Sequence, residues 1–228
     1  RLVDPRDELR MVHLSNTNVP HRSASECCAN ASSGAAPSFF CERHRMRTLD
    51  AQYRYLPALR WAKRELASLD ESVGWVALVD DDSFVFPRGL ARILGRLNAS
   101  LPLHIGDFWR DQAEGGAGLG RPQYACGGGG SVFSRAAMER MDVSGCIARL
   151  HTRCSQSDWM VGECARWAGV HFVADHGCTC VEWRDDTERR VREGLHRGSC
   201  AFLQFPNSPG ARGGPFKDLV PLLRNMSR

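Results

Sequence analysis

The sequence lacks long hydrophobic runs and dense blocks of charge, and each absence argues against one class of protein. No stretch of the 228 residues approaches the roughly 20 apolar residues of a membrane-spanning helix. The net charge is only +4, and the 30 Lys and Arg residues are scattered rather than gathered with aromatics, so nucleic acid is not an expected partner. With 43% hydrophobic and 25% charged residues, the composition fits a globular protein with one sizeable core.

The ten cysteines contain no CxxC pair, which makes disulfides a better interpretation than zinc sites. Three glycosylation sequons begin at Asn30, Asn98 and Asn225. Together these features favour an oxidising, secretory compartment. The cysteines are Cys27, Cys28, Cys41, Cys126, Cys146, Cys154, Cys164, Cys178, Cys180 and Cys200.

The chain opens on Arg1 rather than Met and shows no signal peptide. We therefore expect a processed or trimmed fragment of a longer protein. Any membrane anchor would lie outside this chain.

Strands alternate with helices along the chain, which predicts an α/β sheet. The apolar spacing around Leu59 and Leu66 predicts a helix over residues 49–69, with a kink or break at Pro57. Other expected strands are Arg10–Ser15, Gly74–Val79, Leu103–Gly106, Ser131–Phe133 and His171–Ala174. Other expected helices begin at Pro87, after the cap Ser134 and at Ser157, with a possible last helix over Phe216–Leu223.

Three adjacent acids, Asp80, Asp81 and Asp82, follow the apolar run Gly74–Val79. A buried strand that ends in acids delivers them to the edge of a sheet, where open α/β sheets bind ligands. Adjacent carboxylates repel one another, and a hard cation such as Mg²⁺ or Mn²⁺ would relieve that repulsion. An acidic turn explains the triplet equally well.

Four consecutive glycines, Gly127 to Gly130, offer backbone amides and room for a ligand to approach the main chain. The alternative is a flexible hairpin turn. The segment does not fit GxGxxG in its strand–turn–helix context, and it lacks the Lys of a P-loop.

Asp158 follows Ser157 at an expected helix start. Taken alone, it is best interpreted as an acid that stabilises the first helical turn, and only secondarily as a general base. His176 could be a metal ligand, although a lone His is more often structural. Cys178 and Cys180 are better interpreted as disulfide partners, and His104 as an ordinary strand residue.

Taken in order, these pieces resemble the Fringe-like β-1,3-glycosyltransferases, which include Fringe and the core 1 galactosyltransferases. The resemblance runs from about residue 49 to residue 183. It rests on Trp75–Val85, His104–Gly106, the Cys126–Arg135 glycine segment, and Ser157–Asp158 opening a helix that ends at Ala168–Val170.

The resemblance implies a GT-A fold, the nucleotide-diphospho-sugar transferase fold, with a mixed central sheet flanked by helices. The chain would be a single catalytic domain over residues 1–228, with a loop-rich start (1–48), a best-matched core (49–183) and a loop-rich tail (184–228). The family's first strand, which helps hold the uracil, has no counterpart in the sequence, so we expect it to be missing here.

The resemblance also implies an inverting, Mn²⁺-dependent hexosyltransferase that uses a UDP-sugar donor. The acceptor would be a sugar hydroxyl on a glycoprotein or glycan. The implied setting is the secretory lumen, specifically the Golgi, with type II membrane topology in the full-length protein.

By the same resemblance, Asp82 would bind the metal, while Asp80 and Asp81 would lie near the ribose and sugar of the donor. Gly127, Gly128 and Gly129 would line the sugar site, and Asp158 would be the catalytic base. His176 is the nearest candidate for the family's His metal ligand, in a segment whose register departs from the family pattern.

Two other functions remain open. A catalytically inactive sugar-binding or chaperone-like relative would keep the fold, and the uncertain His ligand and the missing first strand motivate that alternative. A metal-dependent hydrolase would need more His and Asp ligands at strand ends than the sequence offers.

Overall fold

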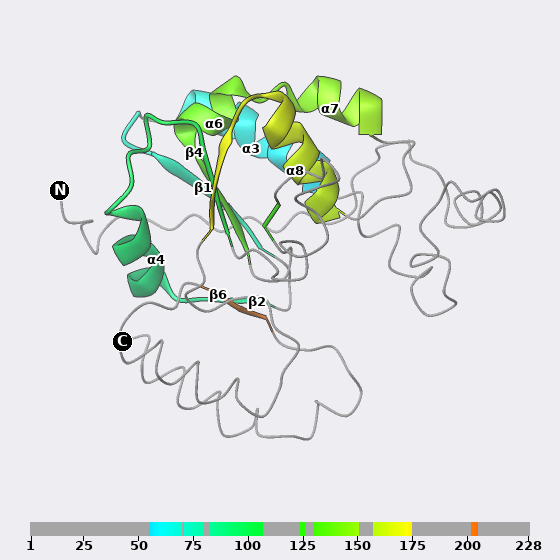
Figure 1. Cartoon of the computed structure of the whole chain (residues 1–228). Helices are drawn as coiled ribbons and strands as arrows, with labels where there is room; N and C mark the ends of the chain where they lie inside the picture. The colour runs from blue at the N-terminus through cyan, green and yellow to red at the C-terminus, as the bar shows by residue number, and fades with distance from the viewer. Residues whose placement is uncertain are drawn as a thin grey trace, which may run out of the picture.

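The computed structural model describes residues 55–69, 71–79, 83–106, 124–125, 130–150, 157–174 and 202–204. Within these residues the chain forms a mixed sheet with helices on both faces (Figure 1). This agrees with the expected α/β architecture. The strand predicted at Arg10–Ser15 and the helix predicted at Phe216–Leu223 lie outside the described residues.

Four strands form the main sheet in the order β1-β4-β3-β5. Strands β3 and β5 are parallel, whereas β4 runs antiparallel to both of its neighbours, β1 and β3. A second, two-stranded sheet pairs β2 (Ser83–Val85) with β6 (Phe202–Gln204) in antiparallel fashion. The main strands are β1 (Trp75–Leu78), β3 (Leu103–Gly106), β4 (Ser131–Ser134) and β5 (His171–Ala174).

Strand β1 confirms the predicted strand but not its predicted burial. Trp75, Val76 and Leu78 are half-buried, and Ala77 is exposed. The expectation of a buried strand was wrong because β1 is an end strand of the described sheet, with a partner on one side only. Strands β3 and β4 lie in the middle, and every residue of both is buried.

The two faces of the sheet are covered by different helices (Figure 1). Around Phe133, one continuous core contains residues from α3, α6, α7 and α8. On the other face, Leu90 of α4 (Pro87–Leu94) packs with Ile105 and Val132. The helices of the first face are α3 (Tyr55–Ser68), α6 (Arg135–Arg140), α7 (Val143–Leu150) and α8 (Ser157–Trp167).

Most helix ends follow the local signals in the sequence. Pro87 opens α4, where its missing amide costs nothing. Ser134 caps α6, because its hydroxyl accepts the amide of Ala137 at 3.1 Å. After α8, Gly169 has a φ of 64°, a left-handed conformation that glycine adopts without strain. Pro57 does not break α3, which runs on from it to Ser68, since a proline near a helix start displaces no hydrogen bond.

The sequence interpretation missed α7, although its signal was present. Val143, Cys146, Ile147 and Leu150 are all buried and recur at helical spacing. Asp142 precedes them, and its Oδ1 accepts the amide of Gly145 at 2.9 Å, which is an N-cap contact.

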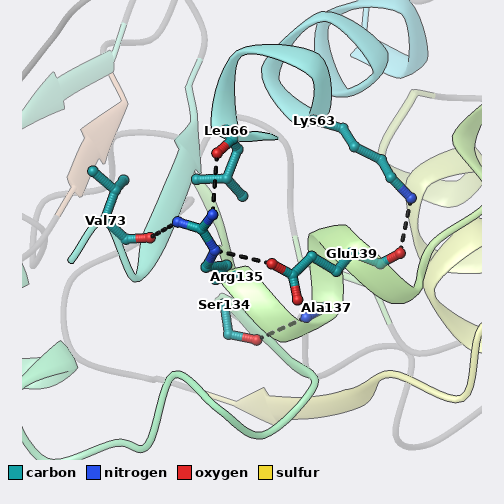
Figure 2. A network of polar contacts seen from close by, with 7 residues as sticks. All are labelled: Lys63, Leu66, Val73, Ser134, Arg135, Ala137 and Glu139. Carbon is teal, nitrogen blue, oxygen red and sulfur yellow. Dashed lines mark hydrogen bonds and ion pairs between the residues drawn. The ribbon is translucent and has the colours of Figure 1, made fainter. Parts of the chain in front are cut away.

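A polar network ties α3 and the start of β1 to α6 (Figure 2). Arg135 donates to the carbonyls of Leu66 and Val73, both at 3.3 Å, and pairs with Glu139 at 2.9 Å. Lys63 donates to the carbonyl of Glu139 at 2.9 Å, near the end of α6. Cations suit that position because the last carbonyls of a helix have no partner within it.

Both cysteines within the described residues are paired. Cys146 and Cys164 form a disulfide that joins α7 to α8, with their Cα atoms 5.6 Å apart. This confirms the disulfide interpretation for these two residues. None of the described helices is long and apolar enough to cross a membrane.

Candidate functional site

The strand register aligns four residues across one edge of the main sheet. Leu78 of β1 pairs with Ser131 of β4, Ser131 pairs with Gly106 of β3, and Gly106 pairs with Ala174 of β5. Three of these residues end their strands, whereas Ser131 begins its strand because β4 runs in the opposite direction. Four distant chain segments therefore meet the same edge of the sheet.

Each predicted site segment is joined to this edge. The acids Asp80 to Asp82 connect Val79, just after β1, to Ser83, the first residue of β2. The glycine segment leads directly into Ser131, and His176 comes two residues after the end of β5. The predicted residues Asp80, Asp81, Asp82, Gly127, Gly128, Gly129 and His176 themselves lie outside the described residues.

Close packing fixes the edge where β3 ends. A Cβ atom added to Gly106 would collide with the Cβ of Ala125, and it would lie 3.1 Å from the carbonyl oxygen of Gly130. Gly130 has a φ of 79°, so it turns the chain into β4 in a conformation that favours glycine. Ala125 and Gly130, which flank residues 126–129, thus approach the end of β3.

Asp158 is half-buried in the first turn of α8. Its Oδ1 accepts the amide of Trp159 at 2.9 Å. The ring of Trp159 lies against that of Tyr124, with centroids 5.8 Å apart, and Tyr124 adjoins the Ala125 that touches Gly106. The N-terminal end of α8 is therefore linked through two aromatic rings to the edge where β3 ends.

A buried histidine lies beside this edge. The Nε2 of His104 is 2.6 Å from the Oγ of Ser131, and its ring stacks on Phe133 with centroids 4.3 Å apart. The side chain is 1% exposed. Burial lowers the pKa of His104 from 6.5 to about 3, because a charged imidazole would lose its hydration there. The sequence correctly predicted a strand residue but not this hydrogen bond.

His104 should make folding stability depend on pH. Its folded pKa lies below its unfolded value of 6.5, so the unfolded chain binds a proton that the folded chain does not. Stability is complete above pH 6.5 and falls by roughly 1 kcal/mol per pH unit as the pH drops from there toward 3. Urea unfolding across that window measures the slope, which should flatten in His104→Phe; an equal slope in both proteins would contradict the assignment.

Among the described residues, no group of three or more His, Cys, Asp or Glu side chains could hold a metal ion. The predicted metal ligands Asp82 and His176 are not among those residues. The metal site therefore stays a prediction.

Comparisons with known proteins agree with the ordered motifs. The model of the family described as Fringe-like matches residues 16–172, more than half of the chain. This match begins earlier than the resemblance in the sequence and ends before His176.

Several curated relatives match about half of the chain. A β-1,3-glucosyltransferase of Mus musculus is 34% identical over 117 residues, which cover 50% of this chain and 23% of that protein. The Homo sapiens β-1,3-glucosyltransferase is 30% identical over 127 residues, covering 54% and 24%. Chondroitin sulfate synthase 3 of Mus musculus is 29% identical over 135 residues, covering 57% and 14%.

These relatives are much longer than the region that they share with this chain, which spans less than a quarter of each. The extent of the family match settles the classification, and the chain belongs to the Fringe-like family.

Proposed function

We propose that this chain is a single catalytic domain of an inverting β-1,3-glycosyltransferase that moves a hexose from a UDP-sugar to a sugar hydroxyl on a glycoprotein or glycan. One observation carries the proposal. The acid-tipped β1, the glycine segment before β4, the end of β5 and the start of α8 are all joined to one edge of the sheet. Ligands of open α/β sheets bind at such an edge.

Asp158 would act as the general base. Its carboxylate would take the proton of the acceptor hydroxyl while that oxygen attacks C1 of the hexose in line with the leaving group. The bond between C1 and the phosphate oxygen breaks, UDP leaves with the electron pair, and the anomeric centre inverts. A negative charge at the start of α8 is favoured by about 0.3–1 kcal/mol through the helix dipole.

The donor would be held by the segments that leave the sheet. Asp80 and Asp81 would lie near the ribose and sugar, and the amides of Gly127, Gly128 and Gly129 would line the sugar site. Asp82 and His176 would hold Mn²⁺. When bound, the ion neutralises the charge that develops on the departing diphosphate.

The spacing of the strands is compatible with one shared ion. Neighbouring strands lie about 4.8 Å apart, so the ends of β1 and β5 are separated by about 14 Å across the four-stranded order. An extended chain covers about 3.5 Å per residue, so the segments from Leu78 to Asp82 and from Ala174 to His176 can together span about 20 Å. This reach supports the pairing of Asp82 with His176.

The first experiment is an assay of UDP release with a panel of UDP-hexoses and acceptors, with and without MnCl₂. Asp82→Ala should weaken donor binding at least about ten-fold, because a charge-assisted metal contact is lost. Calorimetric titration with UDP and MnCl₂ measures that affinity. Asp142→Asn, at a helix start on α7, is the control and should bind UDP like the wild type.

Full turnover by Asp82→Ala would contradict the metal assignment. If the wild type shows no turnover and no Mn²⁺-dependent binding of UDP, the chain is better explained as an inactive sugar-binding or chaperone-like relative than as an enzyme. This alternative is favoured by the segment around His176, which departs from the family pattern.

We further infer that the chain works in the secretory lumen, in the Golgi, and carries N-linked glycan at Asn98. Asn98 is exposed, and its Oδ1 accepts the amide of Ser100 at 3.0 Å in the turn before β3. That turn lies where β3 begins, at the opposite end of the strand from Gly106. A glycan there would leave the candidate site open.

Secretion of the chain from eukaryotic cells tests this inference. Release of glycan by an amidase should convert Asn98 to Asp, and Ser100→Ala should abolish the modification while Ser100→Thr keeps it. Peptide mass spectrometry reads out the site. An unmodified Asn98 in secreted protein would contradict the inference.

A further inference from the structure

His104 is an energetically unfavourable residue at its buried position in the sheet. It lies in the middle of the sheet, stacked on Phe133 and edge-on to Phe172, whose ring centroid is 5.2 Å away. Its Nδ1 is buried and has no hydrogen-bond partner in the part of the chain that the structure describes. A buried polar atom without a partner destabilises the fold, and a phenylalanine would fill a similar space without that cost.

Among the described residues, the single polar contact of this imidazole is its hydrogen bond to Ser131. The two side chains lie on the same face of the sheet, since Ser131 is two residues from the cross-strand partner of His104, Phe133. This face is the one covered by α3, α6, α7 and α8. Ser131 is 4% exposed and is the first residue of β4, directly after Gly130.

The bond therefore acts on the junction between the glycine segment and the sheet. An imidazole that stays neutral can hold the Ser131 hydroxyl as donor or as acceptor, and the pairing restricts the rotamer of that side chain. Restricting the first residue of β4 also restricts the backbone that enters it. A donor site built on backbone amides binds more tightly when those amides are already in place.

We propose that His104 and Ser131 are positioning residues that fix the backbone at the start of β4, beside the proposed donor site, and so strengthen binding of the UDP-hexose donor. The proposal rests on the proposed function. Neither side chain touches the reacting atoms. Their effect should fall on donor binding and leave the chemical step at Asp158 unchanged.

The decisive variant is the double substitution His104→Phe with Ser131→Ala. It removes both polar partners together, so no buried group is orphaned and the aromatic stack on Phe133 is kept. Its melting temperature should equal or exceed that of the wild type. The KM for the UDP-hexose donor should rise about ten-fold, the worth of one hydrogen bond, while kcat stays within about two-fold.

Ser134→Ala is the matched control. Ser134 is a buried serine at the other end of β4, and its hydroxyl caps α6 and accepts the amide of Leu103 at 2.9 Å. Its loss should lower the melting temperature and leave the donor KM unchanged. The two variants thus separate a positioning role from a purely structural one.

Calorimetry with UDP-glucose and MnCl₂ provides a second measurement of donor affinity in the same proteins. A double variant that matches the wild type in both KM and affinity would overturn the positioning role while leaving the proposed function intact. If the wild type itself neither binds UDP-glucose nor turns over any UDP-hexose, both proposals fall. Reduced kcat with unchanged donor KM would also overturn the positioning role.

Discussion

Asp158→Asn should lower kcat by about two to four orders of magnitude, the usual contribution of a general base. The amide of Asn cannot take the proton of the acceptor hydroxyl. It has the same size as the carboxylate, and its oxygen can still accept the amide of Trp159, so α8 should begin as before. Binding of UDP with MnCl₂ should remain close to that of the wild type, as calorimetry would measure.

The control for this prediction is an acid in an equivalent local setting. Asp142 also lies at a helix start, directly before α7, and its Oδ1 accepts the amide of Gly145 at 2.9 Å, but unlike Asp158 it is exposed. Because Asn is as good a helix cap as Asp, Asp142→Asn should keep full activity. Undiminished turnover in Asp158→Asn would remove this residue from the mechanism and require a base elsewhere.

Among the proposed substitutions, removal of the disulfide between Cys146 and Cys164 should lower the free energy of unfolding the most. The bond closes a loop with a sequence separation of 18, for which chain entropy predicts about 3 kcal/mol of stabilisation. For a domain of this size, that corresponds to a fall of about 6–12 °C in melting temperature. Calorimetric unfolding of the double variant Cys146→Ser with Cys164→Ser would measure it.

The same bond joins α7 to α8, the helix that carries the proposed base Asp158. Met160, Val161 and Ala165 bury the rest of that helix in the core, so α8 should stay folded at low temperature in the double variant. Activity should therefore survive well below the new melting temperature and vanish earlier on heating. An unchanged melting temperature would show that packing alone holds the helix.

Local signals in the sequence were sufficient to predict most of the helices and strands. The apolar run Gly74–Val79 predicted β1 to within one residue at each end. The cap Ser134, the opening Pro87 and the glycine after α8, Gly169, lie at helix ends that the structure confirms. Helix α7 was predictable from the spacing of Val143, Cys146 and Ile147, and was overlooked rather than hidden.

Pairing between distant segments could not be predicted in this way. Nothing in Ser83–Val85 indicates that Phe202–Gln204 is its partner, and the half-burial of β1 follows from its end position, not from its own residues. The order of motifs identified the family, whereas the ring contact between Tyr124 and Trp159 beside Asp158 arises only from packing. The role of His104 depends on Ser131, which only the register of β3 and β4 brings within reach.

The strand order β1-β4-β3-β5 has a consequence for how the chain folds. Among the described strands, the only neighbours in the main sheet that are also consecutive along the chain are β3 and β4, and residues 107–130 separate them. Such distant pairing slows folding, because the entropic cost of closing long loops comes before any stabilising contact between the strands. Among the described strands, the partner of β1 is β4, so during synthesis this pairing waits until residue 134 has left the ribosome. Until then the apolar side chains of β1 lack that partner and can be bound by chaperones.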